Sequence, residues 1–132
     1  MNIGQLAKAS GVKSNLIRYY ESIGLIPVTQ RTDSNYRVYR PEDIHLLKFI
    51  KHSRNLGFSI PEIEVLLGLW NDSERSSADV KDLANKHIMA LEAKVQEIQT
   101  VLKTLKQLVN SCNGNARPEC PILEELADGQ FL

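Results

Sequence analysis

Two cysteines near the C-terminus are the residues best suited to chemistry. Cys112 and Cys120 lie eight residues apart, and they are the only cysteines in the chain. Thiolates are soft ligands, and two of them with no third ligand nearby favour an ion of low coordination number: Cu(I), Ag(I) or Au(I). Zn(II) usually takes four ligands. The pair therefore predicts a linear S–metal–S site across a compact loop, and these residues do not rank the three ions.

The same two thiols permit other functions. A reversible disulfide would make the chain a thiol redox sensor, and simple Cu(I) binding would make it a cytosolic metal buffer. The N-terminus lacks a basic patch followed by an apolar stretch, and no run of 18 apolar residues occurs. We therefore expect a cytoplasmic protein without a transmembrane helix, where a structural disulfide is disfavoured.

A long helix must position this loop. Apolar residues recur at alternating intervals of four and three, which is a heptad seam over more than three repeats. The seam consists of Ala84, Ile88, Leu91, Val95, Ile98, Leu102, Leu105 and Val109. A helix over 77–110, with Ser76 or Ser77 as its cap, would be about 50 Å long at about 1.5 Å per residue. The residues after it are too few to cover it, so a second copy of the chain is expected to, which gives a homodimer.

The N-terminal part carries the opposite charge from the rest. Residues 1–56 hold nine Lys and Arg residues against four acids, a net charge of +5, and residues 57–132 have a net charge of −5. Two short helices follow Asn2 and Ser14, the expected N-caps, with Gly11 between them. Residues 28–40 then read as a hairpin with a turn at 33–35. A basic helix-turn-helix followed by a hairpin wing predicts binding to double-stranded promoter DNA.

Side chains at the start of the second helix can reach base edges and phosphates, and the wing and third helix can add phosphate contacts. One of Tyr19 and Tyr20 is expected to lie in the core, and periodicity does not decide which. The candidate DNA-binding residues are Lys13, Ser14, Asn15, Arg18, Tyr20, Arg31, Tyr36, Arg37 and Arg54.

Three motifs of the N-terminal part resemble those of the MerR family of metal-responsive transcriptional regulators. They are Ile17-Arg18-Tyr19-Tyr20-Glu21 with Gly24-Leu25-Ile26, Asn35-Tyr36-Arg37 with Tyr39, and Leu56-Gly57-Phe58-Ser59. The segment 76–81 and the Cys112…Cys120-Pro121-Ile122 loop are similar to the CueR branch, which senses monovalent coinage metals. The resemblance covers the chain from Met1 to the C-terminal loop.

The resemblance implies a mainly α fold: a winged helix-turn-helix domain over 1–70, a linker over 71–76, a dimerisation helix over 77–110 in an antiparallel coiled coil, and a metal-binding loop with a short helix over 111–132. It implies a homodimer that distorts promoter DNA when it binds a monovalent ion, and so activates copper, silver or gold resistance genes for RNA polymerase.

The resemblance also bears on metal selectivity. Related sensors of divalent ions place a cysteine where Ser77 stands, so a divalent ion would lack that ligand here. We expect Ser77 and Lys81 to lie behind the cysteines of the partner chain and to offset the net charge of −1 of a bis-thiolate with one monovalent ion. An enzyme is not expected, because the chain has no Gly-rich phosphate loop, HExxH or GxSxG motif.

Overall fold

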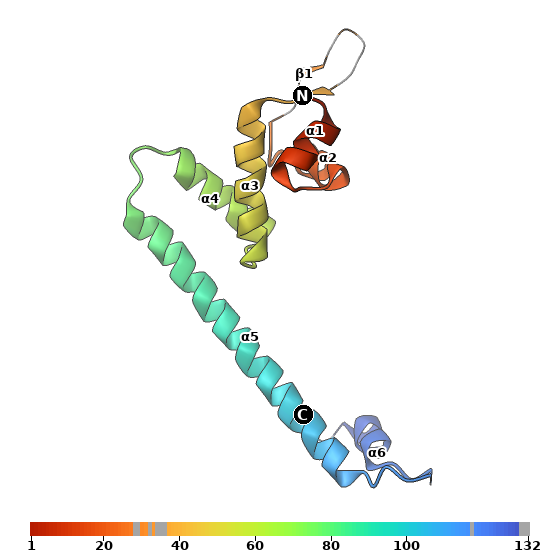
Figure 1. Cartoon of the computed structure of the whole chain (residues 1–132). Coiled ribbons are helices and arrows are strands. Elements are labelled where there is room, and N and C mark those ends of the chain that lie inside the picture. Colours follow the sequence, from red (N-terminus) through yellow and green to blue (C-terminus); the bar gives the residue numbers. More distant parts are fainter. Residues whose placement is uncertain (28–29, 32, 34–36, 117, 130–132) are drawn as a thin grey trace. The chain divides into compact units, whose positions relative to one another are not determined.

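The computed structural model describes residues 1–27, 30–31, 33, 37–116 and 118–129. Six helices and two short strands follow in the order α1 (Ile3–Ser10), α2 (Ser14–Ser22), β1 (Gln30–Arg31), β2 (Arg37–Val38), α3 (Pro41–Asn55), α4 (Ile60–Asn71), α5 (Ser77–Ser111) and α6 (Pro121–Asp128) (Figure 1). Contacts divide the chain into two compact units, Met1–Val80 and Lys81–Leu132. The expected mainly α fold is confirmed.

The helix-turn-helix forms as the sequence predicts, with one correction at its second helix. The Asn2 side chain accepts a hydrogen bond from the Gln5 N–H, and the Gln5 side-chain oxygen accepts one from the Asn2 N–H, which is the expected capping box of α1. Gly11 ends α1 at φ 76°, where glycine is favoured. Ser14 is the first residue of α2 and not its N-cap. Lys13 takes that place without a side-chain capping bond, and Val12 and Ile17 on either side of this start are buried.

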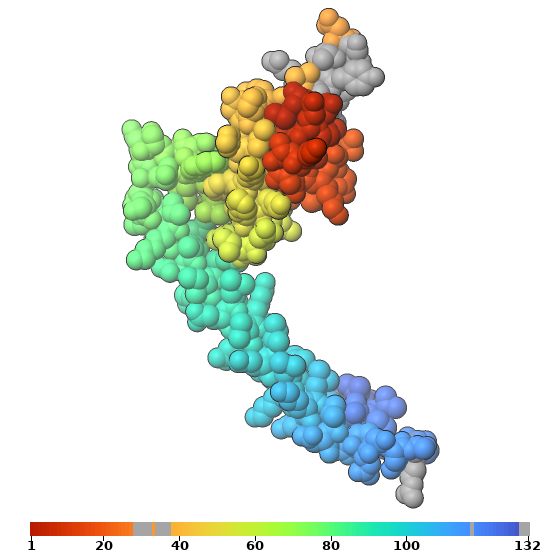
Figure 2. All heavy atoms as spheres, viewed as in Figure 1, coloured from red at the N-terminus to blue at the C-terminus, as the bar shows by residue number. Residues whose placement is uncertain are grey.

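One hydrophobic core holds the first unit together. Helix α1 contacts α2 and α3, and α3 contacts α4, so four helices surround it. The spheres of α1 lie directly against those of α3 in Figure 2. The fully buried side chains of this core include Leu6, Ile17, Ile26, Tyr39, Leu47, Ile50 and Ile63. Fully burying side chains of this size contributes about 1.5–3 kcal/mol each. This packing holds α2, the second helix of the helix-turn-helix and the expected recognition helix, in a fixed position.

The wing is an antiparallel hairpin, as expected. Strands β1 and β2 pair with Gln30 opposite Val38 and Arg31 opposite Arg37. The expected turn at 33–35 falls partly outside the described residues, and so does Tyr36. The hairpin ends at Tyr39, whose side chain is buried, so the base of the wing is anchored in the core.

Helices α3 and α4 begin at the predicted signals. Pro41 opens α3, and the Asp43 carboxylate accepts a hydrogen bond from the Arg40 N–H at 2.9 Å. Ser59 and Glu62 form the predicted capping box of α4. Near the end of α4, the ring of Trp70 stacks on Phe49 of α3 with centroids 4.4 Å apart.

Helix α5 is long and continuous over Ser77–Ser111, close to the predicted limits. The Ser76 hydroxyl accepts a hydrogen bond from the Ala78 N–H, so Ser76 is the cap. The seam residues from Ile88 to Val109 are 39 to 61% exposed, which leaves an apolar stripe along the helix. The short last helix α6 falls within the segment 111–132 where a short helix was expected, and it lies beside the final turns of α5 (Figure 1). Among the described residues, none of the helices combines the length and apolar character needed to cross a lipid bilayer.

Candidate metal loop and nucleic-acid interface

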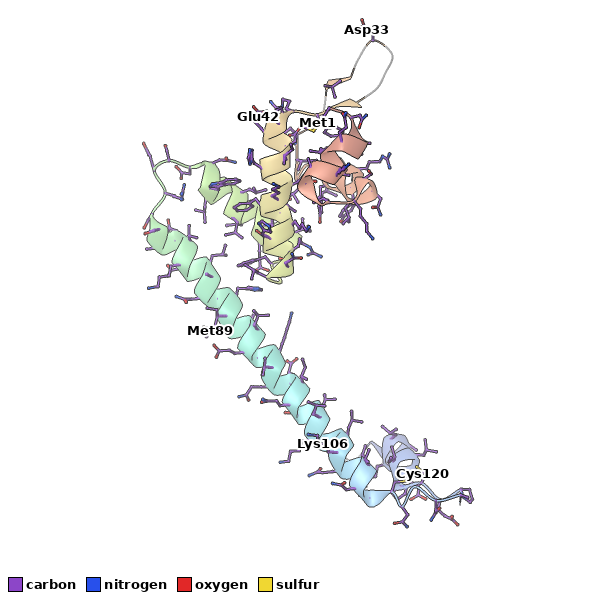
Figure 3. The ribbon with its side chains drawn as sticks, in the orientation of Figure 1. Met1, Asp33, Glu42, Met89, Lys106 and Cys120 are labelled. Atoms are coloured by element: carbon purple, nitrogen blue, oxygen red, sulfur yellow. The ribbon has the colours of Figure 1, made fainter. Side chains whose placement is uncertain are left out.

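The two cysteines meet where α5 ends and α6 begins. Cys112 directly follows Ser111, the last residue of α5, and its N–H donates to the Val109 carbonyl at 3.1 Å. Cys120 is the N-cap residue of α6, and its carbonyl accepts a hydrogen bond from the Glu124 N–H at 3.1 Å. Cys120 lies beside the C-terminal end of α5 in Figure 3. Both side chains are half-buried, so the loop brings two accessible thiols together.

The surroundings of Cys120 favour its thiolate. The Cys120 side chain makes no capping hydrogen bond to α6, but the backbone N–H of Leu123 lowers its pKa most strongly. The N–H of Ile122 and the Cys112 side chain also lower this pKa, whereas partial burial and the Glu124 carboxylate raise it. The net effect is a lowered pKa of Cys120. This agrees with the positive end of a helix favouring an anion. The Cys112 contribution shows that the two side chains lie close enough to interact.

The described residues group no third metal ligand with the two thiols. In the part of the chain that the structure describes, no three His, Cys, Asp or Glu side chains come together as a metal site. His45 and His52 lie on α3, and His87 lies on α5. The arrangement offers an ion two sulfur ligands, which suits a soft ion of low coordination number.

Ser77 and Lys81 are exposed on the first turns of α5. Almost the whole of this helix, about 50 Å at about 1.5 Å per residue, separates them from Cys112 of the same chain. Within one chain they cannot contact the metal loop. Their expected role behind the cysteines therefore requires a partner chain and stays a prediction.

The recognition helix presents the expected polar residues. Lys13, Asn15 and Arg18 are exposed, and Ser14 is half-buried. The structure decides between the two tyrosines: Tyr20 is 6% exposed and belongs to the core, whereas Tyr19 is 52% exposed. A phosphate contact by the Tyr20 hydroxyl remains a prediction, and Tyr19 becomes a second candidate on this surface.

The other predicted DNA-binding residues lie on the wing and on α3. Arg31 and Arg37 occupy directly paired backbone positions of the hairpin. Arg54 donates from Nη1 to the Phe58 carbonyl at 3.3 Å, so this guanidinium also holds the α3–α4 turn.

Sequence reasoning missed a contact that joins the wing to the recognition helix. The Tyr39 hydroxyl donates to Oε2 of Glu21 at 2.9 Å. The backbone of Tyr39 also pairs with Met1: the Tyr39 N–H donates to the Met1 carbonyl at 2.8 Å, and the Met1 amine donates to the Tyr39 carbonyl at 3.0 Å. Glu21 and Tyr39 both belong to the motifs quoted above. They are 18 positions apart in the sequence, and no periodicity links positions so far apart.

Known proteins similar to this chain identify its class. The signature of the MerR helix-turn-helix regulatory proteins matches residues 1–69, and that of the MerR DNA-binding region matches residues 44–108. Heavy metal-dependent transcription regulator 2 of Rhizobium meliloti is 52% identical over 98% of this chain and 88% of its own length. The regulator CueR of Escherichia coli is 35% identical over 96% of this chain and 94% of its own length.

A solved structure agrees with the fold. The transcription regulator PbrR691 of Ralstonia metallidurans, in complex with lead(II), aligns with a TM-score of 0.85 at 32% identity, over 96% of this chain and 98% of that one. These matches indicate a dimeric, DNA-binding regulator and not an enzyme. The chain belongs to the MerR family of helix-turn-helix transcription regulators.

Proposed function

We propose that this chain is a metal-responsive regulator that activates copper, silver or gold resistance genes. It binds promoter DNA as a homodimer, and a monovalent ion bound by Cys112 and Cys120 makes it distort that DNA. The observation that carries the proposal is the convergence of the two half-buried thiols between α5 and α6. The relatives support a metal response, because one is named heavy metal-dependent and another is CueR.

The donor set favours a monovalent ion over a divalent one. Two thiolates satisfy Cu(I), Ag(I) or Au(I), whereas divalent zinc usually takes four ligands. Position 77 is serine, and a third sulfur from this position is therefore absent. The relative solved with lead(II) is similar in fold, and metal choice in this chain depends on the side chains around the loop.

A symmetric pairing of the α5 seams supports the homodimer and the role of Ser77 and Lys81. The seam runs from Ala84 to Val109, so its midpoint lies between residues 96 and 97. An antiparallel pair with two-fold symmetry about that point sets each residue opposite the one equally far beyond the midpoint. Lys81 then lies level with Cys112 of the partner subunit, and Ser77 lies level with its loop.

This placement gives Lys81 an electrostatic role. Two thiolates and one monovalent ion leave a net charge of −1, and an ammonium group from the partner chain offsets it. Lys81→Met is expected to weaken binding of Cu(I) about tenfold, which corresponds to about 1.4 kcal/mol. Lys86→Met, one and a half turns further along α5, is the matched control. Equal affinities of the two variants would refute this role.

DNA recognition rests on α2 and the wing. The exposed Lys13, Asn15 and Arg18 supply donors and charge for phosphates and base edges, with Ser14 at the start of the helix. Arg31, Tyr36 and Arg37 of the wing and Arg54 of α3 extend the contact to the flanking backbone. Activation then follows from a change of DNA shape that aligns the promoter for RNA polymerase in the bacterial cytoplasm.

The deciding experiment is transcription from a promoter fragment selected by the purified dimer, with RNA polymerase and under strictly reducing conditions. Cu(I), Ag(I), Au(I), Zn(II) and Hg(II) are titrated separately. Activation by the monovalent ions, its loss in Cys112→Ser and Cys120→Ser, and unchanged promoter binding by both variants are expected. Activation by Zn(II) alone, or activation that survives both substitutions, would contradict the proposal.

The thiol pair also favours a second candidate, a redox sensor. Two adjacent thiols can form a disulfide when an oxidant such as a hydroperoxide accepts their two electrons and two protons. In that case hydroperoxide, and not metal, would change transcription in the same assay. A Cu(I) buffer would bind metal and leave transcription unchanged.

A further inference from the structure

The linker between α4 and α5 contains one arginine that holds the end of α4. Nη1 of Arg75 donates to the carbonyls of Leu69 at 3.1 Å, Trp70 at 3.2 Å and Asp72 at 3.1 Å. The last carbonyls of a helix lack partners within the helix and carry its partial negative charge. The positive guanidinium satisfies two of them, those of Leu69 and Trp70, together with the carbonyl of the following C-cap residue Asp72.

Backbone contacts order the rest of the linker. The Asp72 N–H donates to the Leu69 carbonyl, and the Arg75 N–H donates to the Asp72 carbonyl, each at 3.3 Å. The Asp72 carboxylate accepts a hydrogen bond from the Glu74 N–H at 2.9 Å. The linker is therefore a sequence of short turns folded back on the end of α4.

The first turn of α5 follows at once. The Ser76 hydroxyl accepts from the Ala78 N–H, and the Ser76 carbonyl accepts from the Asp79 N–H, both at 3.1 Å. These contacts all lie within the compact unit Met1–Val80. Arg75 thus directly precedes Ser76, the cap of α5, and its side chain is hydrogen-bonded to the C-terminal end of α4.

We propose that Arg75 is the positioning residue that couples the metal loop to the DNA-binding unit. This inference rests on the proposed function, in which the loop of one subunit lies against Ser77 and Lys81 of the other. When the loop changes on metal binding, it displaces the start of α5. Because Arg75 ties that start to α4, the displacement moves the core helices that carry α2, and the linker does not absorb it.

The test separates coupling from binding. Arg75→Gln removes the charge and most of the donor geometry, and Arg75→Lys keeps the charge without the planar guanidinium. Glu74→Gln is the matched control, because the Glu74 contact in the linker comes from its backbone N–H. For each full-length dimer we would measure the affinity for Cu(I), the affinity of the metal-free dimer for the promoter, and activation by Cu(I).

We expect Arg75→Gln to keep both affinities within about twofold and to lose about fivefold or more of the metal-induced activation, the lower end of ordinary coupling between sites. Arg75→Lys should be intermediate, and Glu74→Gln should match the parent chain. A merely structural role would instead lower both affinities and the unfolding midpoint together.

Trp70 supplies a second readout. It is the only tryptophan, its carbonyl accepts a hydrogen bond from Arg75, and its ring stacks on Phe49. Binding of Cu(I) should change the fluorescence of Trp70 in the parent dimer. The same binding should change the Trp70 fluorescence much less in the Arg75→Gln dimer.

Two results would overturn the inference, and they differ from each other. Full activation and an unchanged fluorescence response in Arg75→Gln, with a responsive parent chain, would refute the role of Arg75 alone. A parent chain that binds the promoter but responds to no metal would refute the proposed function and this inference with it.

Discussion

The most direct test of the assembly is a charge placed in the middle of the α5 seam. Ile98 lies near the midpoint of the seam and is 59% exposed in the single chain. Burying a whole isoleucine side chain contributes about 1.5–3 kcal/mol, so covering this exposed part contributes about 1–2 kcal/mol per chain. Ile98→Lys changes two symmetry-related positions of the dimer and is expected to cost about 2–4 kcal/mol. That raises the dissociation constant of the dimer about 30- to 1000-fold.

The assay is sedimentation equilibrium over a dilution series, with promoter binding measured in parallel. The control is Ala93→Lys, which adds the same charge at an exposed position away from the seam. Lysine is a good helix former, so neither variant should unfold α5. Dissociation constants of the two variants within threefold of each other would show that the seam is not the dimer interface.

Three more predictions follow from the described contacts. Arg18→Ala should weaken promoter binding about tenfold and reduce its salt dependence by about one phosphate contact, with Cu(I) affinity unchanged; a salt titration of the DNA affinity measures both. Tyr39→Phe removes the hydrogen bond to Glu21 and should lower the free energy of unfolding by about 1–2 kcal/mol, which urea unfolding would detect; an unchanged midpoint would contradict it. Glu124→Gln removes a carboxylate that raises the pKa of Cys120, so the pKa should fall further and alkylation of Cys120, followed by peptide mass spectrometry, should begin at lower pH. An upward shift would mean that Glu124 acts in another way.

Local patterns predicted most of the elements. The capping boxes at Asn2 and Ser59, the proline at the start of α3 and the heptad seam of α5 act between residues a few positions apart. Such signals are readable in one dimension because the helix repeat brings residues three or four apart to the same face. The start of α2 differs by one residue from the prediction, because the expected cap Ser14 is already helical and Lys13 in front of it makes no side-chain capping bond.

The candidate site was predictable in part. The spacing of Cys112 and Cys120 indicated a loop with two sulfur ligands, and Pro121 indicated a helix that would favour the Cys120 thiolate. Their closeness depends on the path of the loop, which spacing alone does not give. The role of Ser77 and Lys81 depends on a second chain, so neither the sequence nor a single subunit decides it.

The sequence by itself determined the helices, the apolar seam, the charge division and the donor chemistry of the two thiols, because each depends on residue type and local spacing. Only the tertiary structure decided that Tyr20 is buried while Tyr19 is exposed, that Tyr39 joins Glu21, and that Arg75 holds the end of α4. The physical reason is the same in each case. These contacts arise when separate elements pack or when the chain turns back on itself, and no repeat along the chain encodes which side chains then meet.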